Sequence, residues 1–348
     1  QSGLQSSQYA LVRGYAGVTY EERWQHELLY NQPPPGLDIK LNINLALQKR
    51  ADELLGNHKG AVVLVNAQTG EIYAMASHPS FNANTIAENW DRLMQRTDAP
   101  LLNRATQGSY PLGTLANTLA YGSLVESKHA FDLGTAEDFY RLDPFCYRAM
   151  QNAGSSLNAF QFGCSSVSEL ILNSTNPANL QADLEAFGLF SAPELAIETA
   201  QPSPALSIDQ LDADPLSVMS INVSPVQMAM VAASITNNGM RPAPNLVNSY
   251  FTPEGNWQAL GPNKAAVVVL SESLAEEIQG ELHAKTQSIW YQTGHALINQ
   301  EEPLTWFIGG TTPEWSATPL AIAIAIEENA PELAMKIGNT LLSLSVSN

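Results

Sequence analysis

The sequence predicts an α+β fold, in which strands from both ends of the chain form one antiparallel sheet around an inserted, mainly helical region. Three observations support this prediction. Two apolar runs within residues 60–77 flank an Asn-Ala-Gln-Thr-Gly turn, the pattern of a β-hairpin. Residues 131–201 are mostly polar and contain no strong strand pattern. Three strand-like segments then return near the C-terminus, so early and late strands can complete one sheet.

Individual elements follow from local periodicity. Residues 41–54 have apolar side chains at helical spacing, and residues 113–127 can form a helix. A buried helix is expected over residues 223–235, because Pro225 is tolerated in a first turn and Asn237-Asn238-Gly239 can end it. The late elements are strands at 288–296, 304–310 and 320–327 and a helix at 331–344.

Composition excludes several classes of protein. The 348 residues are 45% hydrophobic, which is enough for a large core. Acidic residues outnumber basic ones by 34 to 16, giving a net charge of −18, and Lys and Arg form no cluster, so no nucleic-acid partner is expected. No apolar run reaches 18 residues, so we expect membrane attachment only through an N-terminal anchor absent from this chain. Neither cysteine is in a CxxC pattern, and no metal or cofactor is predicted.

Six segments match one known family in order. The longest is GAVVLVNAQTGEIYAMASHPSFNAN at residues 60–84. The others are LNIN with LQ in 41–48, PLLNRA at 100–105, YPLG at 110–113, SPVQMA at 224–229 and WFIG at 306–309. They resemble the transpeptidase domain of class B-like penicillin-binding proteins, in the serine β-lactamase and DD-peptidase superfamily.

The resemblance extends over about residues 14–345 and implies a division of the chain. Residues 1–36, which end in Pro33-Pro34-Pro35-Gly36, are similar to the remnant of an N-terminal pedestal and linker. Residues 37–348 resemble the transpeptidase domain, with a helical insertion at about 130–205. The fold implied is that of the DD-peptidases and β-lactamases.

The family acylates a serine by means of S-x-x-K, S-x-N and K-T-G motifs. The first position reads Thr114-Leu115-Ala116-Asn117 here. Threonine keeps a hydroxyl, but its β-branch hinders attack. Asn117 cannot act as a general base, because an amide does not titrate near neutral pH.

The other two motifs differ in how well they survive. By its position after an apolar helical segment, Ser174-Thr175-Asn176 resembles an intact second motif, although a helix cap or turn would also suit these residues. The third position reads Gln292-Thr293-Gly294, in which a neutral amide replaces the lysine. His295 follows, either as a surrogate base for Thr114 or as an ordinary exposed or core histidine.

These changes predict a catalytically inactive pseudoenzyme. Loss of one member of a nucleophile–base unit costs on the order of 10⁴ to 10⁶ in rate, and here three positions have changed. The resemblance implies a role in peptidoglycan synthesis or cell division at the outer face of the cytoplasmic membrane. We expect a binding or scaffold module that takes a peptidoglycan stem peptide or β-lactam in the cleft, or a cell-wall or division protein. The alternative is a weakly active or altered DD-transpeptidase, carboxypeptidase or esterase that uses Thr114.

Two cysteines lie in the expected helical insertion. In an extracytoplasmic domain, Cys146 and Cys164 can form a disulfide that closes a loop of about 19 residues and contributes roughly 3 kcal/mol. The alternative is a pair of separate, inert thiols.

Overall fold

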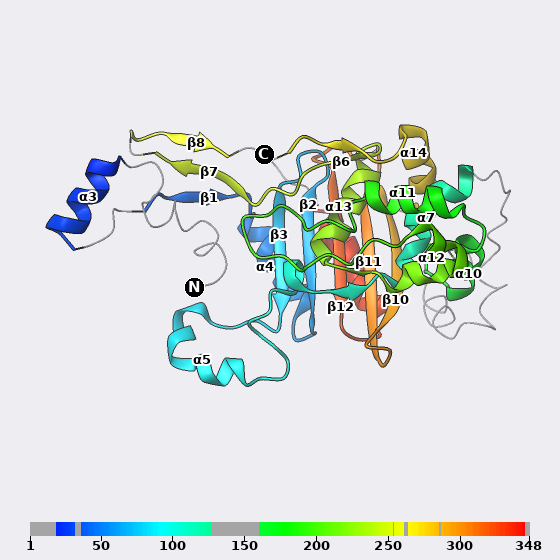
Figure 1. The fold of residues 1–348 in the computed structure, drawn as a ribbon, viewed down its shortest axis with the longest axis horizontal. Coiled ribbons are helices and arrows are strands. Elements are labelled where there is room, and N and C mark those ends of the chain that lie inside the picture. The colour runs from blue at the N-terminus through cyan, green and yellow to red at the C-terminus, as the bar shows by residue number, and fades with distance from the viewer. Residues whose placement is uncertain are drawn as a thin grey trace.

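The centre of the molecule is a five-stranded antiparallel sheet with the strand order β10-β11-β12-β2-β3 (Figure 1). The computed structural model describes residues 19–31, 36–126, 160–252, 254–260, 264–284 and 287–344. The five strands are β2 (Gly60–Asn66), β3 (Ile72–His78), β10 (Ile289–Ile298), β11 (Glu302–Thr311) and β12 (Leu320–Ile326). Because β12 pairs with β2, the early hairpin and the late strands form one sheet, as the sequence predicts.

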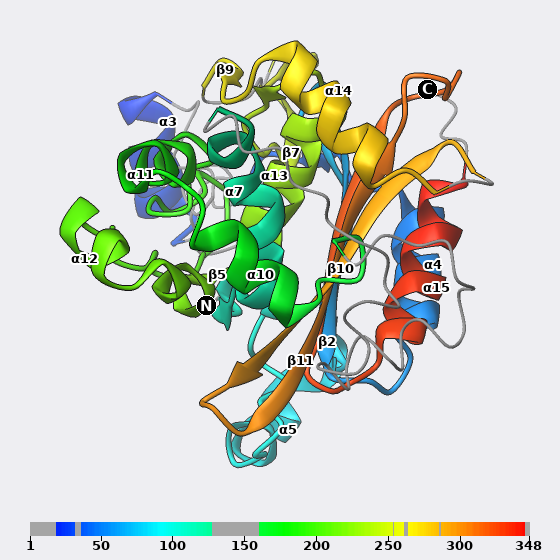
Figure 2. The same cartoon turned by 90° about the vertical axis from the view of Figure 1, so that its right-hand side faces the viewer.

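Strand β12 shows why the sheet is covered on both faces. Its sequence LAIAIAI alternates large and small side chains, and successive side chains of a strand point to opposite faces. The isoleucines pack with α4 (Leu45–Leu55) and α15 (Pro331–Leu342). The alanines face α13 (Pro225–Thr236), and their small size lets this helix approach the sheet closely. Figure 2 shows α4 and α15 on one side of the sheet and α13 on the other.

Helix α13 is almost entirely buried, and its start is fixed locally. Ser224 and Gln227 form a capping box, in which each side chain bonds the backbone N–H of the other residue. Pro225 occupies the first turn, where its missing N–H costs nothing. The helix predicted over residues 223–235 is therefore present, but it begins at Pro225, because Val223 belongs to a short strand, and it runs to Thr236.

A mainly helical region lies beside the β10 edge of the sheet (Figure 2). Its elements include η2 (Gly113–Leu115), α7 (Ala116–Glu126), α10 (Ser165–Leu172), α11 (Pro177–Ala186), α12 (Ile208–Ala213), η3 (Pro215–Ser220) and α14 (Glu272–Glu281). Helices α10 and α11 each pack on α7. Together with α13 they share one large apolar core with the sheet.

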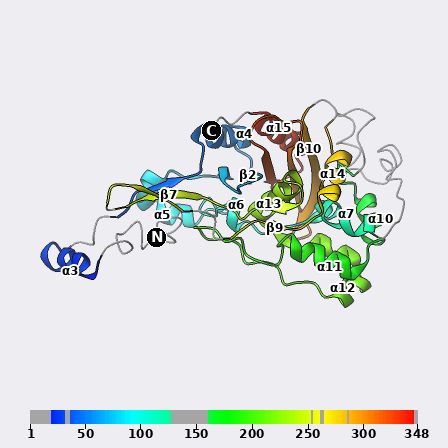
Figure 3. The same ribbon diagram turned by 90° about the horizontal axis from the view of Figure 1, so that it is seen from above.

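The remaining elements lie around this body. A three-stranded sheet of β1 (Ile39–Leu41), β7 (Val247–Phe251) and β8 (Trp257–Ala259) leads away from it toward α3 (Tyr20–Leu29), which stands apart in Figure 3. The others are α5 (Ile86–Met94), η1 (Ala83–Thr85), α6 (Arg104–Gln107) and the strand pairs β4 (Tyr110–Pro111) with β5 (Asn222–Val223) and β6 (Met240–Arg241) with β9 (Val267–Val268). Within the described ranges, no helix is long and apolar enough to cross a membrane.

Candidate functional site

Thr114 lies in η2, directly against β10. A left-handed backbone at Gly113 (φ +57°) makes this approach possible. A Cβ at this position would lie 2.0 Å from the carbonyl oxygen of His295, so no other residue fits without moving the strand. The consequence is that Thr114 is fully buried.

The hydroxyl of Thr114 is enclosed on several sides. Its Oγ1 accepts a hydrogen bond from the backbone N–H of His295, at 2.9 Å. A Cβ on Gly163 would lie 2.6 Å from the same oxygen, and one on Gly294 would lie 3.2 Å from it. Two glycines therefore pack against the hydroxyl, where a substrate carbonyl would have to approach.

Asn117 and Gln292, the two amides predicted to stand at the lysine positions of the motifs, have different environments. The Oε1 atom of Gln292 accepts a hydrogen bond from the Thr118 hydroxyl. Its Nε2 atom donates to the carbonyl oxygens of Thr114 (3.2 Å) and Phe160 (3.3 Å). Asn117 is also fully buried, but neither atom of its amide has a hydrogen-bond partner among the described residues. Gln292 thus joins three segments as a neutral group, whereas Asn117 leaves a polar group unsatisfied.

The outer edge of β10 is occupied by the protein itself. The N–H groups of Tyr291, Thr293 and His295 alternate along the side that faces away from β11. They donate to the carbonyl oxygens of Leu282 (3.0 Å) and Gln161 (2.9 Å) and to the Thr114 hydroxyl. No N–H of this stretch remains for an extended substrate or for a developing oxyanion.

The structure brings a different segment to Thr114 than the sequence pattern suggested. Ser174 follows the far end of α10, a helix about 12 Å long. Its hydroxyl donates to the carbonyl oxygen of Leu170, and the Asn176 side chain caps α11, so both residues serve helix ends. The segment that meets Thr114 and β10 is Gly163–Ser165, at the start of α10.

Gly163-Cys164-Ser165 does not read S-x-N, so a motif search passes over it. The sequence signal that could have identified this segment is its position directly before the apolar helix; the Ser174 motif lies after that helix. Cys164 is disulfide-bonded, and Cys146, the other cysteine of the sequence, lies outside the described residues. The contact of this segment with Thr114 therefore became visible only in the tertiary structure.

The His295 side chain contacts Ser165 rather than the Thr114 hydroxyl. Its Nε2 atom lies 2.9 Å from the Ser165 Oγ atom, while only the His295 backbone bonds to Thr114. The His295 imidazole is therefore not placed to accept the proton of the Thr114 hydroxyl. Thr293 and Gly294 keep their places on β10, and the Thr293 N–H bonds to Gln161.

A buried ion pair supports the backbone that leads into Thr114. The Nε atom of Arg104 donates to Glu327 Oε1 (2.6 Å), which also accepts from the Tyr110 hydroxyl (2.8 Å). Burial alone would raise the pKa of Glu327, but hydrogen bonds from Arg104, Lys59 and Tyr110 hold this pKa below its usual range. Burial, followed by the negative charge of Glu327, raises the pKa of Tyr110. The Trp306 indole N–H donates to the carbonyl oxygen of Pro111 (2.8 Å) and so holds the backbone just before η2.

A groove of about 540 Å³ borders the site. Gly113 and His295 line one side of it, and Leu216, Met219 and Asn222 line another. Thr114 is not among its lining residues. The groove is mostly apolar, and it offers a binding surface beside the closed catalytic position rather than access to it.

Comparison with known proteins agrees with this architecture. The model of the penicillin binding protein transpeptidase domain matches residues 60–334. Peptidoglycan D,D-transpeptidase PbpA of Mycolicibacterium smegmatis is 24% identical over 96% of this chain and 76% of its own length.

Among solved structures, PBPA from Mycobacterium tuberculosis superposes with a TM-score of 0.75 at 21% identity, covering 97% of this chain and 87% of that one. Its penicillin G acyl-enzyme complex gives a TM-score of 0.73 with the same identity and coverage. The family model covers most of the chain, and the fold agrees over nearly all of it. The chain therefore belongs to the penicillin-binding protein transpeptidase domain family.

Proposed function

We propose that this protein is a pseudoenzyme of peptidoglycan synthesis or cell division, which keeps the transpeptidase fold but does not transfer acyl groups through Thr114. The observation that carries the proposal is the state of the Thr114 hydroxyl. It is fully buried, it is bonded to the His295 N–H, and two glycines pack against it. Its proposed role is that of a binding or scaffold module outside the cytoplasm.

The chemistry of acylation explains why this environment is unfavourable. A nucleophilic hydroxyl must lose its proton to a base within about 2.6–3.2 Å. It must also come within about 3–3.5 Å of a carbonyl carbon. Neither Asn117 nor Gln292 can take a proton near neutral pH. The β10 N–H that would stabilise an oxyanion is bonded to the hydroxyl itself.

The ligands we propose follow from the family. The fold is shared with PBPA, for which a penicillin G acyl-enzyme complex has been solved. For this chain we propose non-covalent binding of a peptidoglycan stem peptide or β-lactam in the groove beside His295, or docking of a cell-wall or division protein there. The alternative of an altered acyl-transfer enzyme based on Thr114 has less support, because the His295 imidazole pairs with Ser165 instead.

A fluorescent penicillin and intact-protein mass spectrometry test the proposal directly. We expect no covalent adduct on this protein under conditions in which PbpA of Mycobacterium tuberculosis is fully acylated. A stoichiometric adduct mapped to Thr114 would overturn the proposal.

A triple variant, Thr114→Ser, Asn117→Lys and Gln292→Lys, separates two causes of inactivity. We expect it to remain unlabelled too, because Gly163 supplies no hydroxyl and the β10 edge stays occupied. If the variant is labelled, the three side chains alone account for the lost activity and the closed edge does not contribute.

A further inference from the structure

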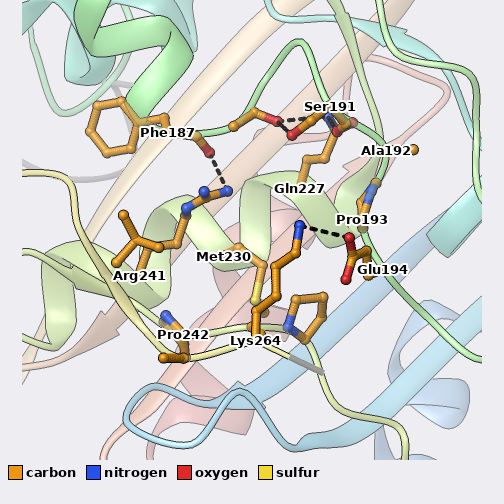
Figure 4. A pocket seen from close by; sticks show the side chains of 15 residues that line it. Phe187, Ser191, Ala192, Pro193, Glu194, Gln227, Met230, Arg241, Pro242 and Lys264 are labelled. Atoms are coloured by element: carbon orange, nitrogen blue, oxygen red, sulfur yellow. Dashed lines mark hydrogen bonds and ion pairs between the residues drawn. The ribbon is translucent and has the colours of Figure 1, made fainter. Parts of the chain in front are cut away.

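A second site lies away from Thr114, in a pocket of about 150 Å³ (Figure 4). The pocket is formed by the segment after α11, by α13 and by the two segments that carry Arg241 and Lys264. Much of its lining is apolar, with Met230 and several prolines. The charged side chains in the lining are Arg241, Lys264 and Glu194.

Arg241 is a partly buried cation without a counter-ion among the residues that the structure describes. Its Nη1 atom donates to the carbonyl oxygen of Phe187 (3.1 Å), but its Nε atom is buried and has no hydrogen-bond partner. No ion pair joins it to a carboxylate within the described ranges. Burial lowers the pKa of Arg241, yet a guanidinium stays protonated in proteins, so the cost of burying its charge is not offset by an acid.

The bond to Phe187 gives Arg241 one structural role. Phe187 is the C-cap of α11, and a cation at a helix C-terminus is favourable. Close approach depends on Gly188, where a Cβ would lie 1.9 Å from Nη1. This role uses one of the five guanidinium donors and leaves the charge itself uncompensated.

The other deeply placed arginine of the described chain shows the contrast. Arg104 is buried too, but it pairs with Glu327 at 2.6 Å and donates to two backbone carbonyls. The whole sequence has 34 acidic residues against 16 basic ones, so acids are not scarce. Arg241 lines a pocket and forms no ion pair with an acid among the described residues, so it is available to an anion from outside.

Glu194 shows that a carboxylate fits the mouth of this pocket. Its Oε1 atom lies 2.7 Å from Lys264 Nζ, and both side chains are well exposed. Figure 4 shows Lys264 turned toward Glu194, while Arg241 points toward Phe187. One cation of the pocket is thus already occupied by an internal carboxylate, and the other is not.

We propose that this pocket binds a small oxyanion, a carboxylate or a phosphate, with Arg241 as the main cation and Lys264 as the second. Guanidinium groups suit both ligands, because their planar donors match the oxygens of carboxylate and phosphate. Glu194 opposes this binding by its charge and by engaging Lys264. The site is independent of the proposal for Thr114 and of its outcome.

Calorimetric titration of the whole protein with inorganic phosphate, and separately with succinate, tests the site and distinguishes the two sources of oxyanion. Ionic strength is held low and constant, because salt screens exposed charges. We expect saturable binding of at least one probe. Arg241→Gln should weaken it by about tenfold or more, the usual loss for a hydrogen bond to a charged group.

Lys264 and Glu194 carry opposite charges at the mouth of the pocket, so neutralising each should change the affinity for the anion in opposite directions. Lys264→Gln should weaken binding, whereas Glu194→Gln should tighten it by removing the competing carboxylate. Arg50→Gln is the matched control, because Arg50 is an exposed arginine 3.6 Å from Glu53, and it should change nothing. If Arg241→Gln fails to fold, the effects of Lys264→Gln and Glu194→Gln on binding still test the proposal.

Three results would overturn the proposal. They are the absence of saturable binding of either probe to both the wild type and Glu194→Gln, wild-type affinity in Arg241→Gln, and an equal loss in Arg50→Gln. The last result would indicate general screening of charge rather than a site.

Discussion

Replacement of Asn117 by alanine should stabilise the protein, although it removes a buried side chain next to Thr114. Both amide atoms of Asn117 are buried without hydrogen-bond partners in the described structure. An unsatisfied buried polar group costs about 1–3 kcal/mol. The amide leaves a cavity of about 30 Å³, which at about 24 cal/mol per Å³ costs about 0.7 kcal/mol. The net gain in the free energy of unfolding is therefore about 0.3–2.3 kcal/mol.

The size of the protein sets how this gain appears in a thermal melt. With an unfolding entropy of about 2.1 cal/mol/K for each of 348 residues, 1 kcal/mol shifts Tm by about 1.4 °C. We expect Asn117→Ala to raise Tm by about 0.4–3 °C, measured by calorimetry or by circular dichroism. Urea denaturation gives the same comparison at constant temperature.

Asn66→Ala is the matched control, because Asn66 is buried but satisfied. Its Oδ1 atom accepts from the backbone N–H groups of Gln68 (2.9 Å) and Thr69 (3.2 Å), and its Nδ2 atom donates to the Tyr73 hydroxyl (3.1 Å). Loss of these bonds should lower stability by about 2–3 kcal/mol. If Asn117→Ala destabilises the protein as Asn66→Ala does, the Asn117 amide has a partner and our account of the site is wrong.

Two further predictions concern the support around the site. Glu327→Gln should lower stability by about 3–5 kcal/mol, because it leaves the buried charge of Arg104 uncompensated. Since folding holds the pKa of Glu327 below its usual value, its contribution to stability is present above the unfolded pKa and is lost as pH falls through the folded pKa. In Glu327→Gln, Tm should therefore fall less steeply with decreasing pH below about pH 5 than in the wild type. The same pH dependence in both proteins would contradict this role of Glu327. Gly163→Ala should destabilise the protein by about 2 kcal/mol or more, because φ is +63° and the new Cβ would lie 2.5 Å from the carbonyl oxygen of Thr293. Gly280→Ala in α14 is its control and should stabilise by about 0.5–1 kcal/mol, since nothing lies within 4 Å of that Cβ; equal effects of the two substitutions would refute the close contact at Gly163.

Elements with a strong local pattern could be predicted from sequence. The hairpin β2–β3, the alternating strand β12 and the capped helix α13 each contain their own signal within a short continuous segment. Strands of two or three residues, such as β1 and β9, do not extend over a full pattern, and they went unpredicted. Their positions depend on partners far away in the chain.

The candidate site divides in the same way. Loss of titratable groups is a property of side-chain chemistry, so Asn117 and Gln292 establish it from the sequence alone. By itself, the pattern around Ser174 could not show which loop meets Thr114, because a three-residue motif specifies no contact. Tertiary structure brought Gly163 to that hydroxyl.

The sequence determined the family pattern and the central sheet, and it predicts amides in place of a base at the two motif positions Asn117 and Gln292. Only the tertiary structure decided that the Thr114 hydroxyl is buried and bonded to the His295 N–H, and that Arg241 lines a pocket whose one lining acid, Glu194, pairs with Lys264 instead. The physical reason is that periodicity and titration are local properties of residues. Burial and pairing depend instead on which distant segments the packed core brings together.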